Sequence, residues 1–132
     1  MGDTPREVAQ RLIRGISEQR FTELADLYAE DTVVELPFSP EHTVMRGRDE
    51  LAKHFAGAAD RPLRVVAKNL VVHETADPEV VVAEYDYDVE AGDRNGTVGN
   101  VLVIRVRDGH IVSSRDYHDH TAIAAIAAIV AG

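Results

Sequence analysis

The dipeptide Asp108-Gly109 constrains the fold of this 132-residue chain more than any other part of its sequence. It separates two runs, 97–107 and 110–119, whose residues are typical of β-strands. Asp-Gly in such a place favours a two-residue turn, whose backbone twist matches that of the strands it joins. The sequence therefore predicts an antiparallel hairpin in which Arg107 faces His110.

The rest of the chain divides into a helical first half and a strand-rich second half. A capping signature, Thr4-Pro5-Arg6-Glu7, begins one helix. A second, short helix carries Phe21 to Tyr28, and a third follows Gly47. A strand over 32–36 ends at Pro37, and further strands are expected over 63–75 and 79–90, with a loop at 92–96. Helices followed by an antiparallel meander predict one α+β domain over residues 1–132.

Composition excludes several functions. The net charge of −9 argues against binding to nucleic acid or to an anionic membrane surface. Without cysteine the chain has no disulfide and no thiolate metal site. The apolar tail, 121–132, is too short to cross a hydrocarbon core of about 30 Å. A cytoplasmic protein is therefore expected.

The hairpin also predicts the surroundings of Asp116. An uninterrupted two-residue hairpin with Arg107 opposite His110 places Val101 opposite Asp116. Opposed residues share a sheet face. That face would hold Val101, Val103, Val112, Ser114, Asp116 and His118. A carboxylate on this aliphatic wall would lose water, which raises its pKa and suits it to proton transfer. Alternatively, Asp116 is solvated near the end of the strand or pairs with Arg64 or Arg115.

The strand over 79–90 leaves a choice of face. Its acids Glu84, Asp86 and Asp88 alternate with Tyr85, Tyr87 and Val89. One interpretation turns the tyrosines inward and leaves the acids in solvent. The other places Glu84 or Asp86 beside Asp116 as an acid/base pair. The register across 92–96 is not fixed by the sequence, so both remain open.

Several strings resemble the nuclear transport factor 2-like superfamily, and specifically its SnoaL-like branch. They are Leu27-Tyr28-Ala29-Glu30-Asp31-Thr32-Val33-Val34, Arg46-Gly47-Arg48-Asp49-Glu50-Leu51, Arg107-Asp108-Gly109-His110-Ile111 and Ser114-Arg115-Asp116-Tyr117-His118-Asp119. The resemblance spans nearly the whole chain. It implies a curved antiparallel sheet in the shape of a cone, packed on three N-terminal helices and followed by a short C-terminal helix. It also implies a homodimer.

The same resemblance can be tested against three kinds of enzyme in the superfamily. Ketosteroid isomerases have catalytic side chains where this chain has Leu12, Leu36 and, near the third position, Val101. The catalytic aspartate of limonene epoxide hydrolases falls on Asp116, as does the acid/base of SnoaL-type polyketide cyclases. The companions of that acid are replaced, by Val33-Val34-Glu35 for the hydrolases and by Ser114 and Arg115 for the cyclases.

The resulting expectation is an isomerase, cyclase or hydrolase acting on a small hydrophobic molecule that is cyclic or polyketide-like. Asp116 would be the catalytic acid/base, and its ligand-binding neighbours would be Ser114, His118, Tyr85, Tyr87, Val101 and Phe38. No cofactor is implied. No metal site is expected either, because Asp116, His118 and His120 lie about 7 Å apart in succession along one strand. The alternative is a non-catalytic ligand-binding or dimerisation module of the same fold.

Overall fold

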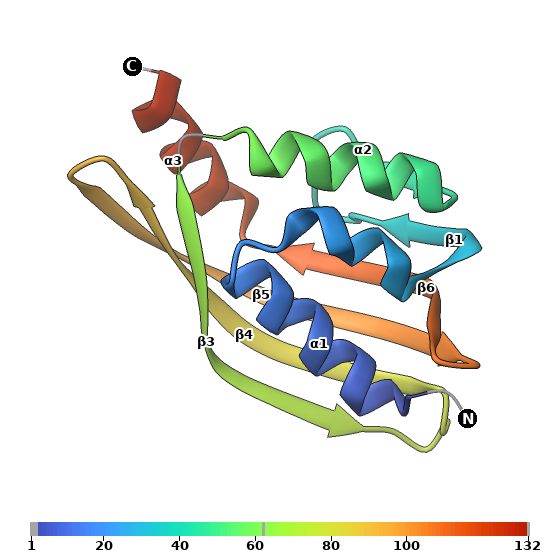
Figure 1. Ribbon diagram of the computed structural model, residues 1–132. Coiled ribbons are helices and arrows are strands. Elements are labelled where there is room, and N and C mark those ends of the chain that lie inside the picture. Colours follow the sequence, from blue (N-terminus) through green and yellow to red (C-terminus); the bar gives the residue numbers. More distant parts are fainter. Residues whose placement is uncertain (1–2, 62, 132) are drawn as a thin grey trace.

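The computed structural model describes residues 3–61 and 63–131 and has the α+β architecture that the sequence predicts (Figure 1). Its elements in chain order are α1 (Pro5–Ser17), the 3₁₀ helix η1 (Phe21–Leu27), β1 (Tyr28–Glu35), β2 (Val44–Arg46), α2 (Arg48–Ala59), β3 (Arg64–Glu74), β4 (Val80–Ala91), β5 (Arg94–Arg107), β6 (His110–His118) and α3 (His120–Ala131). None of the helices among these residues is long and apolar enough to cross a membrane.

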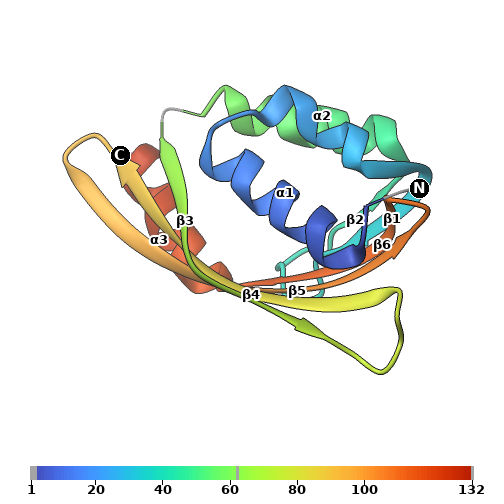
Figure 2. The ribbon, with the colours of Figure 1, turned by 60° about the horizontal axis from the view of Figure 1, so that its bottom comes forward.

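One curved sheet organises the fold, with strand order β2-β1-β6-β5-β4-β3. Every neighbouring pair is antiparallel except β1 and β6, which run parallel because the chain crosses from one to the other through the rest of the domain. The helices α1 and α2 lie on the concave side of the sheet (Figure 2). We call this covered side the inner face and the opposite side the outer face.

Local chemistry explains why α1 begins and packs as it does. The Thr4 hydroxyl accepts from the backbone amide of Glu7, and the Glu7 carboxylate accepts from the backbone amide of Thr4, which completes a capping box. Apolar residues at helical spacing then form one buried stripe of the helix. That stripe packs on the inner face, in a core that also includes Leu102, Ile104 and Ile111.

The β5–β6 hairpin forms as predicted, with Arg107 opposite His110. Asp108 and Gly109 have φ angles of 53° and 77°, as a two-residue turn with two left-handed residues requires. The predicted register beyond the turn is wrong. Val106 pairs with Ile111, but Arg105 pairs with Ser113, so Val112 is an extra residue in β6. This is a β-bulge.

The bulge reverses the facing of every later residue in β6, because side chains alternate between the two faces. Asp116 therefore lies opposite Leu102 rather than Val101, and Ser114 lies opposite Ile104. Both Leu102 and Ile104 are buried core residues of the inner face. Val101 lies on the outer face, opposite Tyr117.

A buried hydroxyl stabilises the irregular region next to the bulge. The pairing of β1 with β6 shifts register between Tyr28 and Val33, near Ile111. Thr32 lies in the shifted segment, is fully buried, and donates from its hydroxyl to the carbonyl of Ile111 at 2.8 Å. A side chain thus satisfies a backbone acceptor at the interruption of the ladder.

The connection between β4 and β5 is shorter than the loop predicted over 92–96. Ala91 pairs with Arg94, so that only Gly92 and Asp93 form the turn and β5 begins three residues earlier than the predicted strand. Gly96 lies within β5, where a Cβ atom would meet the Ile126 side chain of α3 at 3.1 Å. The glycine therefore lets the C-terminal helix approach this end of the sheet closely.

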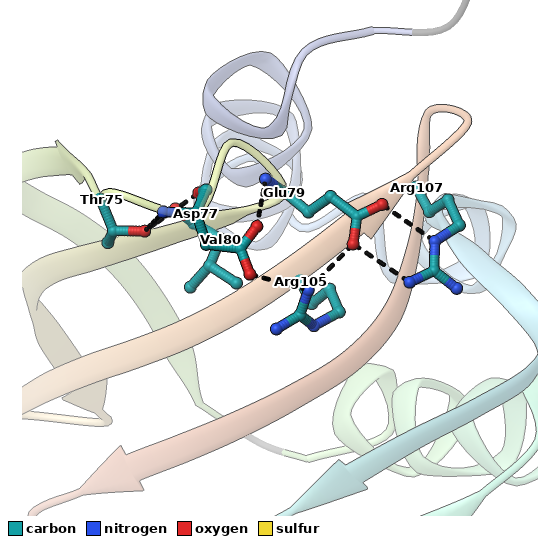
Figure 3. A network of polar contacts seen from close by, with 6 residues as sticks. All are labelled: Thr75, Asp77, Glu79, Val80, Arg105 and Arg107. Carbon is teal, nitrogen blue, oxygen red and sulfur yellow. Dashed lines mark hydrogen bonds and ion pairs between the residues drawn. The ribbon is translucent and has the colours of Figure 1, made fainter.

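At the other end of β4, a polar network fixes the strand's start (Figure 3). The Glu79 carboxylate accepts from Arg105 at 2.9 Å and from Arg107 at 2.9 and 3.1 Å, and Asp77 pairs with Arg105 at 3.1 Å. Hydrogen bonds from Arg107 and Arg105 lower the pKa of Glu79 to about 2. The Asp77-Pro78 break between β3 and β4 is thereby tied to β5.

We predict that Thr32→Val lowers the free energy of unfolding by about 1–3 kcal/mol, because it keeps the shape of the side chain and removes the donor to a buried carbonyl. Urea unfolding measures this change. Thr97→Val is the matched control, since Thr97 is exposed and its hydroxyl contacts only Asp88, at 3.4 Å. Equal effects in the two variants would contradict a role for Thr32 at the bulge.

Candidate active site

The inner face brings together Ser114, Asp116 and His118, which alternate along β6. They face Ile104, Leu102 and Asn100 of β5. Tyr85 of β4 lies opposite Asn100 on the next strand, and Tyr87 follows two residues later on the same face. Five of the residues predicted for the site thus share one face, beneath the helices.

Asp116 is the ionisable group at the centre of this arrangement. Its Oδ1 accepts a hydrogen bond from the Ser114 hydroxyl at 2.5 Å. Burial among protein atoms raises the pKa of Asp116 to about 6, against the opposing effect of the Ser114 hydrogen bond. The side chain is nevertheless not fully enclosed. A carboxyl group with this pKa exchanges its proton near neutral pH.

Three tyrosines surround Asp116 with hydroxyl groups. The Tyr85 and Tyr87 hydroxyls lie 3.1 Å apart, and their rings meet edge to face with centroids 5.0 Å apart. Tyr28 of β1 joins them from the other side of β6. Burial raises the pKa of all three phenols, and the negative charge of Asp116 raises each of them further. These hydroxyls therefore stay protonated and can donate hydrogen bonds.

The tyrosines face inward, as one of the two interpretations of this strand has it, and the acid pair is not formed. Glu84 contacts His73 on the outer side at 2.5 Å, and Asp86 accepts from Asn69 at 3.1 Å. Alternation along β4 places both carboxylates on the face opposite Tyr85. The hypothesis of a second acid beside Asp116 is therefore wrong.

His118 extends the polar group toward α2 and α3. Its Nδ1 lies 2.6 Å from the Oδ1 of Asn100. Burial, together with the neighbouring His120 and His54, lowers the pKa of His118 to about 4. Its ring centroid is 5.9 Å from that of His120, the first residue of α3. The imidazole is therefore neutral at physiological pH.

Two of the predicted ligand-binding residues lie elsewhere. Val101 is on the outer face, opposite Tyr117, and the bulge in β6 is the reason that Asp116 does not share this face. Phe38 is 68% exposed and meets Tyr117, an outer-face residue, edge to face with centroids 5.0 Å apart. The loop after Pro37 therefore brings Phe38 to the opposite side of the sheet from Asp116.

Sequence reasoning missed three residues of this region: Tyr28, Asn100 and His54. Tyr28 begins β1 and is not part of the short helix that the sequence predicts over Phe21 to Tyr28. Asn100 had a detectable signal, an amide inside the apolar run 98–104, and it is only 5% exposed. His54 carries no such signal, because α2 places it near His118 only through tertiary packing.

Two hollows among the described residues lie away from Asp116. One, of about 510 Å³, lies around Ala29 to Asp31, Arg48, 107–108, His110 and Val112. The other, of about 300 Å³, lies against the β4–β5 hairpin. Within the same part of the chain no three potential metal ligands cluster.

The comparisons with known proteins agree with this fold. The SnoaL-like domain matches residues 9–114. The chain belongs to the SnoaL-like domain family. The match ends two residues before Asp116, so that it supports the fold rather than the acid. A search of curated proteins finds no match.

Solved structures share the SnoaL-like fold across nearly the whole chain. A "putative isomerase" from Bacillus subtilis is 22% identical, with 90% of this chain and 91% of that one covered and a TM-score of 0.79. A "putative polyketide cyclase" from Xanthomonas campestris pv. campestris is 19% identical, covering 92% and 94%, with a TM-score of 0.78. A limonene-epoxide-hydrolase-like epoxide hydrolase from M. tuberculosis is 19% identical, covering 97% and 96%, with a TM-score of 0.72. At these identities the likeness shows the fold alone.

We predict that Asp116→Asn stabilises this SnoaL-like domain at pH 7.5 by about 2–3 kcal/mol. The folded pKa, about 6, lies above the model value of 3.8, so the folded state binds the extra proton between these values. The contribution of Asp116 to wild-type stability is thus fully present below pH 4 and is lost as the pH rises through 6. Asparagine avoids this loss and still accepts from Ser114.

Urea unfolding of both proteins from pH 4 to 7.5 tests the effect. The gap between variant and wild type should close toward pH 4. Asp26→Asn is the control, because Asp26 is exposed. A pH-independent difference would show that Asp116 has an ordinary pKa in the folded protein.

Proposed function

We propose that this SnoaL-like domain is an enzyme that transfers a proton on a small hydrophobic molecule, cyclic or polyketide-like, without a cofactor. The reaction would be an isomerisation, a cyclisation or a hydrolysis, with Asp116 as the general acid/base. The observation that carries the proposal is the raised pKa of Asp116 on an apolar face that is lined with protonated tyrosines. A titratable acid of this kind in an enclosed setting is typical of catalytic sites.

The neighbours of Asp116 suit such a reaction. When the carboxylate removes a proton from carbon or from water, negative charge develops on the substrate or on the leaving oxygen. The hydroxyls of Tyr28, Tyr85 and Tyr87 are hydrogen-bond donors on the same face and would stabilise that charge. Ser114 steadies the carboxylate through its 2.5 Å hydrogen bond. Leu102 and Ile104 provide the apolar wall that keeps the acid's pKa near neutrality.

Similar structures carry names of the same reaction types. They include a "putative isomerase", a "putative polyketide cyclase" and an epoxide hydrolase. The ligand-binding set would be Ser114, His118, Tyr85 and Tyr87. Phe38 and Val101 are not part of it, because they lie on the outer face.

One observation favours the alternative, a ligand-binding or dimerisation module without chemistry. Two hollows in the described part of the chain lie away from Asp116. A binding module would hold hydrophobic ligands with or without this carboxylate. The two functions therefore differ in what the loss of the acid does.

We predict that Asp116→Asn lowers kcat/KM by about 10²–10⁴-fold on any substrate that the protein converts, because it removes the general acid/base. Cyclic and polyketide-like ketones and epoxides are incubated with the protein, and products are followed by mass spectrometry. In a base-catalysed step the wild-type rate should rise with pH through a midpoint near 6. Glu84→Gln, on the outer side, is the matched control and should keep full activity.

Full activity of Asp116→Asn would contradict the assignment of the acid. Ligands that bind equally well to wild type and to Asp116→Asn, with no turnover of any compound, would favour the non-catalytic alternative.

The outer face supports a second proposal, that the domain forms a homodimer through it. Val82, Val101 and Val103 are only half-buried there, and no helix of the described chain covers that side (Figure 2). An uncovered aliphatic sheet face of this kind is typical of an interface between subunits. A second copy of the chain would cover it symmetrically.

We predict that the wild-type protein has twice the mass of one chain in light scattering and that Val103→Glu halves it, because a charge would be buried at the centre of the interface. Ala52→Glu adds the same charge on the exposed side of α2 and should remain dimeric. A monomeric wild type would contradict the dimer and would leave the assignment of Asp116 untouched.

A further inference from the structure

A chain of hydrogen bonds leads from the backbone of β5 to His118. The Asn100 amide nitrogen donates to the carbonyl of Val98 at 3.0 Å. The Asn100 amide oxygen lies 2.6 Å from Nδ1 of His118, across the β5–β6 pair in which the two residues are directly opposed. Asn100 is buried, so water does not compete for these contacts.

This chain fixes the orientation of the Asn100 amide. If the amide were turned over, its oxygen would face the carbonyl oxygen of Val98, and two acceptors would lie against each other. The amide nitrogen must therefore face Val98, and the oxygen must face His118. Since that oxygen can only accept, Nδ1 of His118 must carry the hydrogen.

We propose that Asn100 is a positioning residue that holds His118 in the Nδ1–H tautomer, so that Nε2 is presented on the inner face as an unprotonated acceptor. In a neutral imidazole only one nitrogen carries a hydrogen, and the bond made by one nitrogen decides the state of the other. Among the described residues Nε2 has no hydrogen-bond partner. Nε2 of His118 is also partly accessible, so a ligand or water can reach it.

Burial and two neighbouring histidines favour the uncharged ring of His118. His120 at the start of α3 and His54 on α2 lower the pKa of His118, as does burial. Asp116 lies on the same face two residues away, but its carboxylate is bonded to Ser114. Nε2 of His120 is fully enclosed and has no partner in the described chain. Unsatisfied polar atoms of this kind occur at sites that hold a ligand or an ordered water.

The fixed tautomer defines the class of ligand, a statement that rests on the proposed function. An acceptor at Nε2 takes a hydroxyl, enol or other donor group. Asp116, on the same face, would then reach a neighbouring atom of the same ligand. The ligand would therefore be a hydrophobic ring that carries a hydroxyl or enol group, and the corresponding ether would lack the matching donor.

Long-range ¹H–¹⁵N NMR of the whole ¹⁵N-labelled protein tests the tautomer without any substrate. In the wild type, Nδ1 of His118 should have the shift of a protonated nitrogen and Nε2 that of an unprotonated one. Asn100→Leu keeps the size and removes the acceptor, so that the single Nδ1–H form should be lost. His73, which contacts Glu84 on the outer side, is the internal control and should not change.

Asn100→Asp provides a second variant if Asn100→Leu fails to fold. A carboxylate at this position still accepts from Nδ1, and its charge favours the imidazolium. The pKa of His118 should therefore rise by at least one unit, with Nδ1 still protonated. A wild type in the Nε2–H form, or an unchanged His118 in both variants, would overturn the role of Asn100 and leave that of Asp116 standing.

Two probes test the class of ligand: 2-naphthol, which has a hydroxyl group, and 2-methoxynaphthalene, which does not. Calorimetry should show at least about tenfold tighter binding of 2-naphthol to the wild type, as one hydrogen bond supplies. The preference should disappear in Asn100→Leu. Equal affinity for the two probes, or binding of neither, would overturn the ligand class, whereas loss of catalysis in Asp116→Asn would be unaffected.

Discussion

The hydrogen bond from Thr32 to the carbonyl of Ile111 lies at the point on which the arrangement of the site depends. Next to it, Val112 is the extra residue of the bulge, and Ile111 and Ser114 both point inward although three positions separate them. Without that extra residue Asp116 would face outward with Val101. A buried hydroxyl at an interrupted ladder thus makes possible a carboxylate under the helices.

The site that results is polar, and at neutral pH Asp116 carries its negative charge among uncharged neighbours. Protonated tyrosines and a neutral His118 surround one acid whose pKa is raised by burial. Such an environment stabilises the fold less than an apolar one would, because the carboxylate must be deprotonated against its surroundings. Loss of stability of this kind is a common property of functional sites.

The sequence predicted what depends on local chemistry. The capping box of α1, the left-handed turn at Asp108-Gly109 and the alternation of Tyr85 and Tyr87 all follow from neighbouring residues, and the resemblance supplied the order of the elements. The face of Asp116 did not follow, because Val112 looks like any other strand residue and only pairing across strands makes it a bulge. The sequence also predicts a sheltered Asp116, but on the face that holds Val101, and the observed register contradicts that face. Phe38 and His54 depend on how a loop and a helix fold back, which spacing along the chain does not encode.

The bulge also bears on how this family can change over time. Deletion of one residue near Val112 would turn the inward-facing residues of β6 beyond the bulge outward and the outward-facing ones inward. The types of those side chains would stay the same. Relatives that keep the same acid in alignment could therefore differ in whether it is sheltered or solvated. The number of residues between the Asp-Gly turn and the acid would distinguish relatives with a sheltered acid from those with a solvated one. The identity of the aligned residue alone would not.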